Sequence, residues 1–145
     1  MRALILVAFS LGTAYGCDCP GFTVQVAKDR AEIIFRGTII DLRSSDKPSE
    51  LEEVTTKGRT ALFRVTRVWK GNVGPSFEMP AKDERGDCWG FPPDYLKVGT
   101  ELLVYAQRVG GAHFYSSVCT RTQLIKYAGV DLDKLGPGQE PKKSR

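Results

Sequence analysis

The sequence predicts a small all-β domain, a five-stranded Greek-key barrel with short flanking helices and two disulfide cross-links. Runs of alternating or β-branched residues are separated by turns rich in Gly and Pro, a pattern typical of short strands in a barrel or sandwich. The four cysteines form an even set, which indicates a disulfide framework in an exported domain. The 145 residues, 41% hydrophobic and 26% charged, suit a single core.

Residues 1–16 differ from this average and predict a secretory signal peptide. Arg2 precedes the apolar run 3–9, which is too short to cross a bilayer, since that takes about 20 residues. We expect cleavage before Cys17 and a secreted or extracytoplasmic protein, in the periplasm or at the cell surface. The alternatives are a retained anchor and a lipid-modified Cys17, although Tyr15 does not fit a lipidation motif. Loss of Arg2 lowers the net charge from +4 to +3, a mild imbalance.

The cysteines are Cys17, Cys19, Cys88 and Cys119. A bridge between Cys17 and Cys19 would close a strained ring, so we expect each of them to pair with Cys88 or Cys119, in one of two connectivities. Each bridge would close a long loop, stabilise the fold by at most about 4–5 kcal/mol, and hold the mature N-terminus against the domain. A structural zinc site is the alternative, but its ligands usually come in short-spaced pairs.

The first elements follow from local signals. Thr23 is suited to cap a helix that runs to about Arg30. The run 31–42 is rich in β-branched residues and contains Gly37, which predicts a long, bent strand. Residues 43–59 are polar without a sustained apolar period, so they predict a long exposed loop.

The later strands show alternation and turn signals. Residues 60–69 alternate and predict a strand, a shorter strand follows at 77–79, and residues 83–94 form a Gly- and Pro-rich connection. Residues 100–108 and 113–119 predict a hairpin around a Gly-Gly turn.

The chain beyond the last cysteine predicts helices at 122–128 and 131–135, then a disordered basic tail over 136–145. Five strands with one early and two late helices are typical of the oligonucleotide/oligosaccharide-binding (OB) fold. We therefore expect one OB-fold domain over residues 17–135.

Enzymatic chemistry is not expected. His113 is the only histidine, so no catalytic triad or histidine metal cluster can be assembled, and a surface position in the hairpin is expected for it. No cofactor-binding loop is recognised, and we expect no cofactor. Four acidic residues are interpreted as solvated loop residues: Asp18, Asp83, Glu84 and Asp87.

Aromatic and basic residues interleave along the predicted strand 60–69 and its end, a composition that also occurs in nucleic-acid-binding surfaces. The alternation of a strand would place them on two opposite faces, and an exported protein does not normally meet nucleic acid. We therefore expect no nucleic-acid partner. The interleaved residues are Phe63, Arg64, Arg67, Trp69 and Lys70. A second aromatic set could stack on bases or sugars, but we expect its members to lie in the core or to cover a disulfide. This set comprises Trp69, Trp89, Phe91 and Tyr95.

Several motifs in this order carry a resemblance. They are Cys-x-Cys after the cleavage point, AEIIFRGTI, FRVTRVWKG, DCWG, GTELLVYA and YSSVCTRT. Together they resemble the N-terminal inhibitory domain of tissue inhibitors of metalloproteinases, part of the netrin-like module family, over about residues 17–127. The segment AGVDLDKLGPG is similar to small bacterial secreted members. A third disulfide and the cysteine-rich C-terminal subdomain of the animal inhibitors are absent from this sequence.

The resemblance implies the pairs Cys17–Cys88 and Cys19–Cys119. It implies that the α-amino and carbonyl groups of Cys17 chelate the zinc of a partner metalloprotease, so that the only metal contact is made in trans. An α-amine has a pKa of about 7.7–8.0 and a catalytic zinc keeps an open position, so this contact is chemically sound. The implied inhibitory edge comprises Cys17, Asp18, Cys19 and Pro20, with Gly86 and Asp87 as a second contact strip.

Asp18 departs from the family pattern, in which the second mature residue is a small uncharged side chain that enters an apolar pocket of the protease. A carboxylate there costs several kcal/mol to desolvate unless it is paired. The alternative function is therefore a non-inhibitory netrin-like structural or interaction module. In either case we expect a monomer that binds a protein partner and stays off the membrane unless Cys17 is lipidated.

Overall fold

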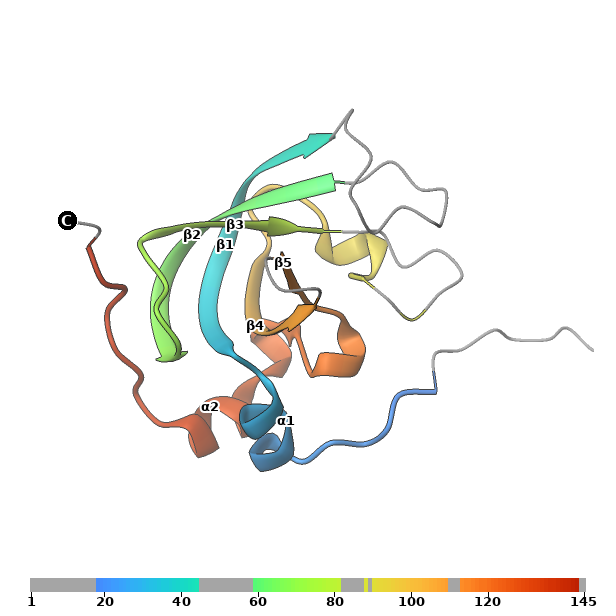
Figure 1. Ribbon diagram of the computed structural model, residues 1–145, viewed down its shortest axis with the longest axis vertical. Coiled ribbons are helices and arrows are strands. Elements are labelled where there is room, and N and C mark those ends of the chain that lie inside the picture. Colours follow the sequence, from blue (N-terminus) through green and yellow to red (C-terminus); the bar gives the residue numbers. More distant parts are fainter. Residues whose placement is uncertain (1–17, 45–58, 82–87, 89, 110–112, 144–145) are drawn as a thin grey trace, which may run out of the picture.

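The fold is mainly antiparallel β-sheet with two α-helices, as the computed structural model shows for residues 18–44, 59–81, 88, 90–109 and 113–143 (Figure 1). The strands follow the order β3-β2-β1-β4-β5, and a sixth, two-residue strand pairs with β4. The predicted signal peptide, most of the predicted loop 43–59 and the predicted Gly-Gly turn lie outside the described residues.

Strands β1 (Ile33–Ser44) and β2 (Arg59–Lys70) confirm the two longest predicted strands and form the centre of the sheet. Their register shifts three times along the pair, once beside Gly37, and such bulges bend and twist a strand. A Cβ at Gly37 would lie 3.1 Å from the Phe35 ring and 3.2 Å from the Arg64 carbonyl oxygen. The predicted bend therefore occurs where the backbone is closely packed.

The remaining strands are β3 (Ser76–Pro80), β4 (Glu101–Val109), β5 (His113–Tyr115) and β6 (Gln123–Leu124). The predicted hairpin is confirmed by the antiparallel pairing of β4 with β5. Its second strand is shorter than predicted, because the chain leaves the sheet at Ser116, whose hydroxyl donates to the Tyr105 carbonyl at 3.0 Å.

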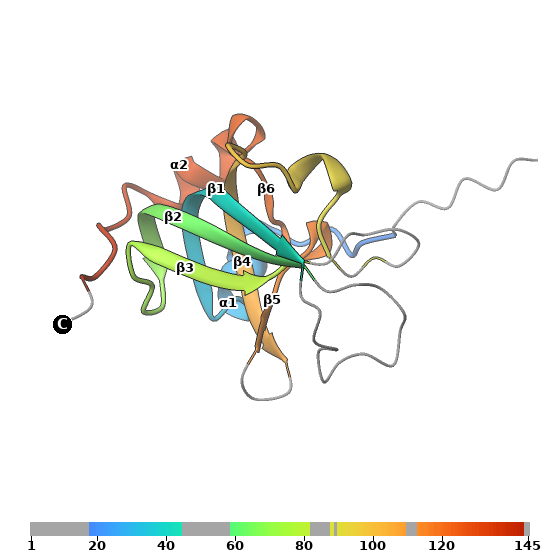
Figure 2. The ribbon, with the colours of Figure 1, turned by 90° about the horizontal axis from the view of Figure 1, so that it is seen from above.

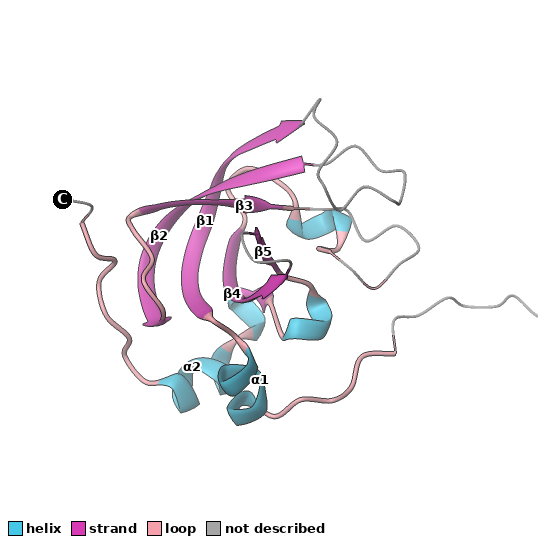
Figure 3. Ribbon diagram, in the orientation of Figure 1, coloured by secondary structure: helices cyan, strands magenta, loops and turns pink. Residues whose placement is uncertain are grey.

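The two α-helices lie together at one end of the sheet (Figure 3). Helix α1 (Val24–Arg30) is capped by Thr23 as predicted, and α2 (Gly129–Leu135) includes the predicted 131–135 helix. Three single-turn 3₁₀ helices complete the described elements: η1 (Pro93–Tyr95), η2 (Val118–Thr120) and η3 (Ile125–Tyr127).

The predicted helix over 122–128 is wrong. Thr122 is buried and its hydroxyl accepts from the Tyr105 backbone N–H at 2.8 Å, which holds the chain against β4. The next two residues form β6 and the following three form η3. Tertiary hydrogen bonds therefore override the local helical pattern.

A chain of edge-to-face aromatic contacts runs through the larger apolar cluster of the sheet. Phe35 contacts both Phe63 and Phe77 with ring centroids 5.4 Å apart, and Phe77 contacts Phe114 at 5.6 Å. Since Phe77 is on β3 and Phe114 is on β5, the last contact joins the two ends of the strand order. A second apolar cluster, between sheet and helices, contains Ala27, Ala31, Ile34, Leu103, Tyr105 and Ala128.

The C-terminal segment, for which the sequence predicts a disordered basic tail over 136–145, makes contacts with β2 and with the connection that follows it as far as Lys142. It runs beside β2 (Figure 2), where Val68 and Gln139 exchange two backbone hydrogen bonds of 2.8 Å. The Trp69 indole N–H donates to the Gly136 carbonyl at 2.8 Å. Strand β3 pairs with β2 only as far as Arg64, and the C-terminal segment supplies backbone hydrogen bonds to β2 beyond that point. The segment therefore has a structural role.

Gly138 makes this contact testable. Its φ is +66°, and a Cβ there would lie 2.9 Å from the Trp69 indole. We expect Gly138→Ala to lower the free energy of unfolding by about 1–3 kcal/mol and to change Trp69 fluorescence. Gly129→Ala is the matched control, since it has open space and no positive φ. Equal stability of the two variants in denaturant titrations would contradict the packing described.

Candidate functional site

The described part of the predicted inhibitory edge lies on the surface. Asp18 and Pro20 are exposed and Cys19 between them is half-buried. Cys17, Gly86 and Asp87 lie outside the described residues, so their predicted roles stay predictions. We call residues 18–22, which lead into α1, the N-terminal segment.

A disulfide joins Cys19 to Cys119, with a Cα–Cα distance of 5.0 Å and a sequence separation of 100. Closing a loop of this length stabilises a fold by up to about 4–5 kcal/mol. The bond also indicates an oxidising setting. Cys88 is disulfide-bonded as well, but its predicted partner is Cys17, and that pairing stays a prediction.

Hydroxyl groups fix the position of Cys119. The Ser117 hydroxyl accepts from the Cys119 N–H at 3.1 Å, and the Thr120 hydroxyl accepts from the Ser117 N–H at 3.1 Å, so η2 carries a reciprocal N-terminal cap. Thr120 lies 2.8 Å from the Tyr105 carbonyl oxygen and is buried. The disulfide is therefore held to the central strand β4 through Tyr105.

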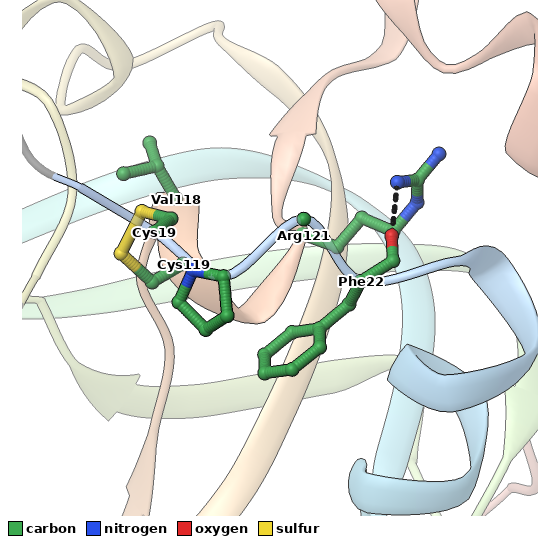
Figure 4. Close-up of a pocket in the computed structure, with 7 residues that line it drawn as sticks. Cys19, Phe22, Val118, Cys119 and Arg121 are labelled. Atoms are coloured by element: carbon green, nitrogen blue, oxygen red, sulfur yellow. Dashed lines mark hydrogen bonds between the residues drawn. A yellow bond between two sulfur atoms is a disulfide. The ribbon is translucent and has the colours of Figure 1, made fainter.

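Arg121 anchors the other end of the N-terminal segment. Its Nη1 donates to the Phe22 carbonyl at 2.7 Å (Figure 4). Its Nε and Nη2 donate to the two oxygens of Asp131, at 2.7 and 2.8 Å. The Tyr105 hydroxyl donates to Asp131 at 2.7 Å. We call Arg121, Asp131, Tyr105 and the Phe22 carbonyl the Arg121 cluster.

The Arg121 cluster places a charge in the interior and satisfies it. Asp131 is 1% exposed and accepts three hydrogen bonds, from Arg121 and Tyr105, which offset the cost of burying a polar side chain. Its hydrogen bond to Arg121 raises the pKa of that guanidinium above the ordinary value. Burial, followed by the hydrogen bond to Asp131, raises the pKa of Tyr105 well above 10.0.

Sequence analysis missed this cluster. Arg121 and Asp131 lie in separate elements and share no motif, and Tyr105 is one aromatic residue in an apolar strand. Arg121 has a φ of +80° and is the one non-glycine residue with a positive φ among those described. An arginine in the sequence does not indicate this conformation, so it could not be used as a signal.

A shallow hollow of about 190 Å³ lies where these two anchors meet (Figure 4). Its lining residues are Cys19, Pro20, Gly21, Phe22, Val118, Cys119 and Arg121. Its walls supply a disulfide, exposed backbone and a guanidinium already bound to Asp131.

Other chemistry has little support in the described part of the chain. No group of three or more potential metal-ligating side chains occurs there, and no helix there is long and apolar enough to cross a membrane. His113 is exposed at the start of β5, which confirms its predicted surface position.

Two arginines of the interleaved set on β2 lie on the same face of the sheet, whereas strict alternation predicts opposite faces. Phe63 is buried, while Arg64 and Arg67 are exposed. The register shift between Arg36 and Gly37 leaves Thr66 unpaired and sets Arg64 opposite Thr38 and Arg67 opposite Arg36. Because residues two apart on β1 share a face, both arginines lie on the same face, not on opposite ones.

The second aromatic set is partly described. Phe91 is fully buried and Trp69 packs against the C-terminal segment, as expected for core residues, whereas Trp89 lies outside the described residues.

No family model matches the chain, and no curated protein matches it.

Tyr105 provides a test of the Arg121 cluster. A group whose pKa is raised on folding stabilises the fold below its unfolded pKa and ceases to do so as the pH rises toward the folded value. We therefore expect the free energy of unfolding to fall as the pH rises above about 10, more steeply than in Tyr105→Phe. Denaturant titrations at several alkaline pH values measure this difference. Parallel pH profiles for the two proteins would contradict a protonated, buried Tyr105.

Proposed function

We propose that the chain is an exported inhibitor of the tissue-inhibitor-of-metalloproteinases type, which binds a zinc metalloprotease through its N-terminal segment. The observation that carries the proposal is an exposed segment with a covalent cross-link: Asp18 and Pro20 are exposed on either side of a cysteine bonded to Cys119. A segment held in this way loses less conformational freedom when it binds.

The same proposal includes an OB-fold barrel. Two observations support it: the strand order β3-β2-β1-β4-β5, and the contact of Phe77 with Phe114 between the two end strands. In a barrel of this kind the loops and the chain end meet at one rim, where a partner can contact several of them at once.

The proposed chemistry requires a chain that starts at Cys17. Its α-amino nitrogen and carbonyl oxygen would occupy the open position on the partner's zinc, and the amine loses its proton near neutral pH. The predicted Cys17–Cys88 bond would fix the chelating group, and Gly86 and Asp87 would add contacts beside it. The chain itself supplies no metal and no catalytic group to this interaction.

The charge of Asp18 restricts which proteases the N-terminal segment could bind. It is exposed and forms no ion pair or hydrogen bond within the described chain. Entry into an apolar pocket would leave its carboxylate unpaired at a cost of several kcal/mol. The proposal therefore favours a protease whose specificity pocket contains a cation or water.

One added residue tests the zinc contact. We expect protein that starts at Cys17 to inhibit at least one metalloprotease of a panel, and the same protein with one extra N-terminal alanine to lose about 100-fold or more in affinity, because the α-amine is displaced from the zinc. Circular dichroism and thermal unfolding serve as fold controls. If neither protein inhibits any protease, the non-inhibitory netrin-like module is the better interpretation.

Asp18→Thr tests the pocket contact. Against proteases with apolar pockets, we expect the inhibition constant to improve by about tenfold or more, because the desolvation cost of the carboxylate disappears. Asp94→Thr removes the same charge at an exposed ion pair with Lys97 and controls for net charge. Equal constants for Asp18→Thr and the parent protein would mean that residue 18 does not enter the pocket.

A further inference from the structure

We propose that Arg121 is a positioning residue that fixes the direction of the N-terminal segment, and that α2 takes part through Asp131. The relevance of this direction to inhibition rests on the proposed function. The positioning itself rests on contacts among described residues, and it can be tested without a protease.

The N-terminal segment is anchored at two points three residues apart. Cys19 is bonded to Cys119, and the Phe22 carbonyl accepts from Arg121. A single anchor leaves the chain free to rotate about it. Two anchors on residues 119 and 121 of the same turn fix both its place and its direction, and Pro20 between them has a restricted φ.

Arg121 is itself held rigidly. Its backbone φ of +80° is a left-handed conformation that is unfavourable for a non-glycine residue, so its surroundings must hold it there. The paired contacts with Asp131 hold the plane of the guanidinium, and the Tyr105 hydroxyl holds Asp131. Such a fork-to-carboxylate geometry belongs to arginine, because a lysine ammonium cannot make three hydrogen bonds in one plane.

Asp131 lies in the first turn of α2, so the Arg121 cluster connects this helix to the N-terminal segment. The connection gives α2 a role beyond covering the sheet. It also gives a carboxylate at a position that is 1% exposed a structural role.

The inference predicts a particular kinetic effect. Without Arg121, only a fraction of the molecules would hold the N-terminal segment in the direction that the protease binds, and the apparent affinity would fall in proportion to that fraction. The association rate would fall with it, whereas the dissociation rate would not change because the contacts in the complex are the same. A general loss of stability would instead lower the thermal midpoint and the fraction of active protein.

Arg121→Lys is the test, with Arg43→Lys as the matched control. Arg43 also contacts two carboxylates, Asp41 and Glu78, but its pairs are exposed and such pairs contribute little. The first readout is the NMR order parameter of the backbone N–H vectors of Gly21 and Phe22, which reports their mobility whether or not they are hydrogen-bonded. We expect it to fall from about 0.8 to below about 0.6 there in Arg121→Lys, to stay unchanged in β1, and to stay unchanged everywhere in the control.

The second readout is the association rate with an inhibited protease, which we expect to fall about three- to tenfold in Arg121→Lys with dissociation unchanged. Asp131→Asn, which keeps the side-chain shape, should give the same local fall in order parameter and guards against a folding defect in one variant. Unchanged order parameters at Gly21 and Phe22 in both variants would overturn the positioning role, whatever inhibition is found. Lower order parameters without inhibition by any form would support the positioning role and count against the proposed function alone.

Discussion

The anchoring of the N-terminal segment to β4 is the constraint on which the candidate site depends. Two links converge on Tyr105: Thr120 connects the Cys19–Cys119 disulfide to its carbonyl, and Asp131 connects Arg121 to its hydroxyl. Chain ends normally fray because few contacts oppose their conformational entropy. Here a covalent bond and a charged hydrogen bond act on a segment of five residues, so an exposed segment is also held in place.

The rest of the structure makes this anchoring possible. Tyr105 is fixed because β4 lies beside β1 in the middle of the strand order, with apolar packing on the helical side. The aromatic contacts from Phe35 to Phe114 hold the end strands together on the other side. The C-terminal segment pairs with a free edge of β2, and unpaired edges otherwise invite association.

Sequence reasoning succeeded where the signal is local. The β-branched run after residue 31 forms the long strand β1, and Thr23 caps α1. The Cys19–Cys119 pair is not local, and of the two connectivities left open by the residues it is the one that the family resemblance implied. Sequence reasoning failed where distant groups decide the conformation. The helix predicted over 122–128 is replaced because the Thr122 hydroxyl bonds to Tyr105.

Some residues of the candidate site could likewise be predicted from the sequence and others could not. Residues 18–20 and Cys119 could be brought together from cysteine arithmetic and family motifs, since a disulfide must join two of four positions. The Arg121 cluster could not, because its parts are far apart in sequence and Phe22 contributes only a backbone carbonyl, which no residue type encodes. The shared face of Arg64 and Arg67 was missed because it depends on a bulge.

The central claim is that Cys17 begins the mature chain and is covalently held to the domain. Intact mass measurement of protein exported by its native host, with and without reduction, tests this most directly. The account predicts the mass of residues 17–145 less one hydrogen for each of the four cysteines, recovered as the thiol form after reduction. A chain that starts at another residue, or free thiols in the unreduced sample, would contradict it.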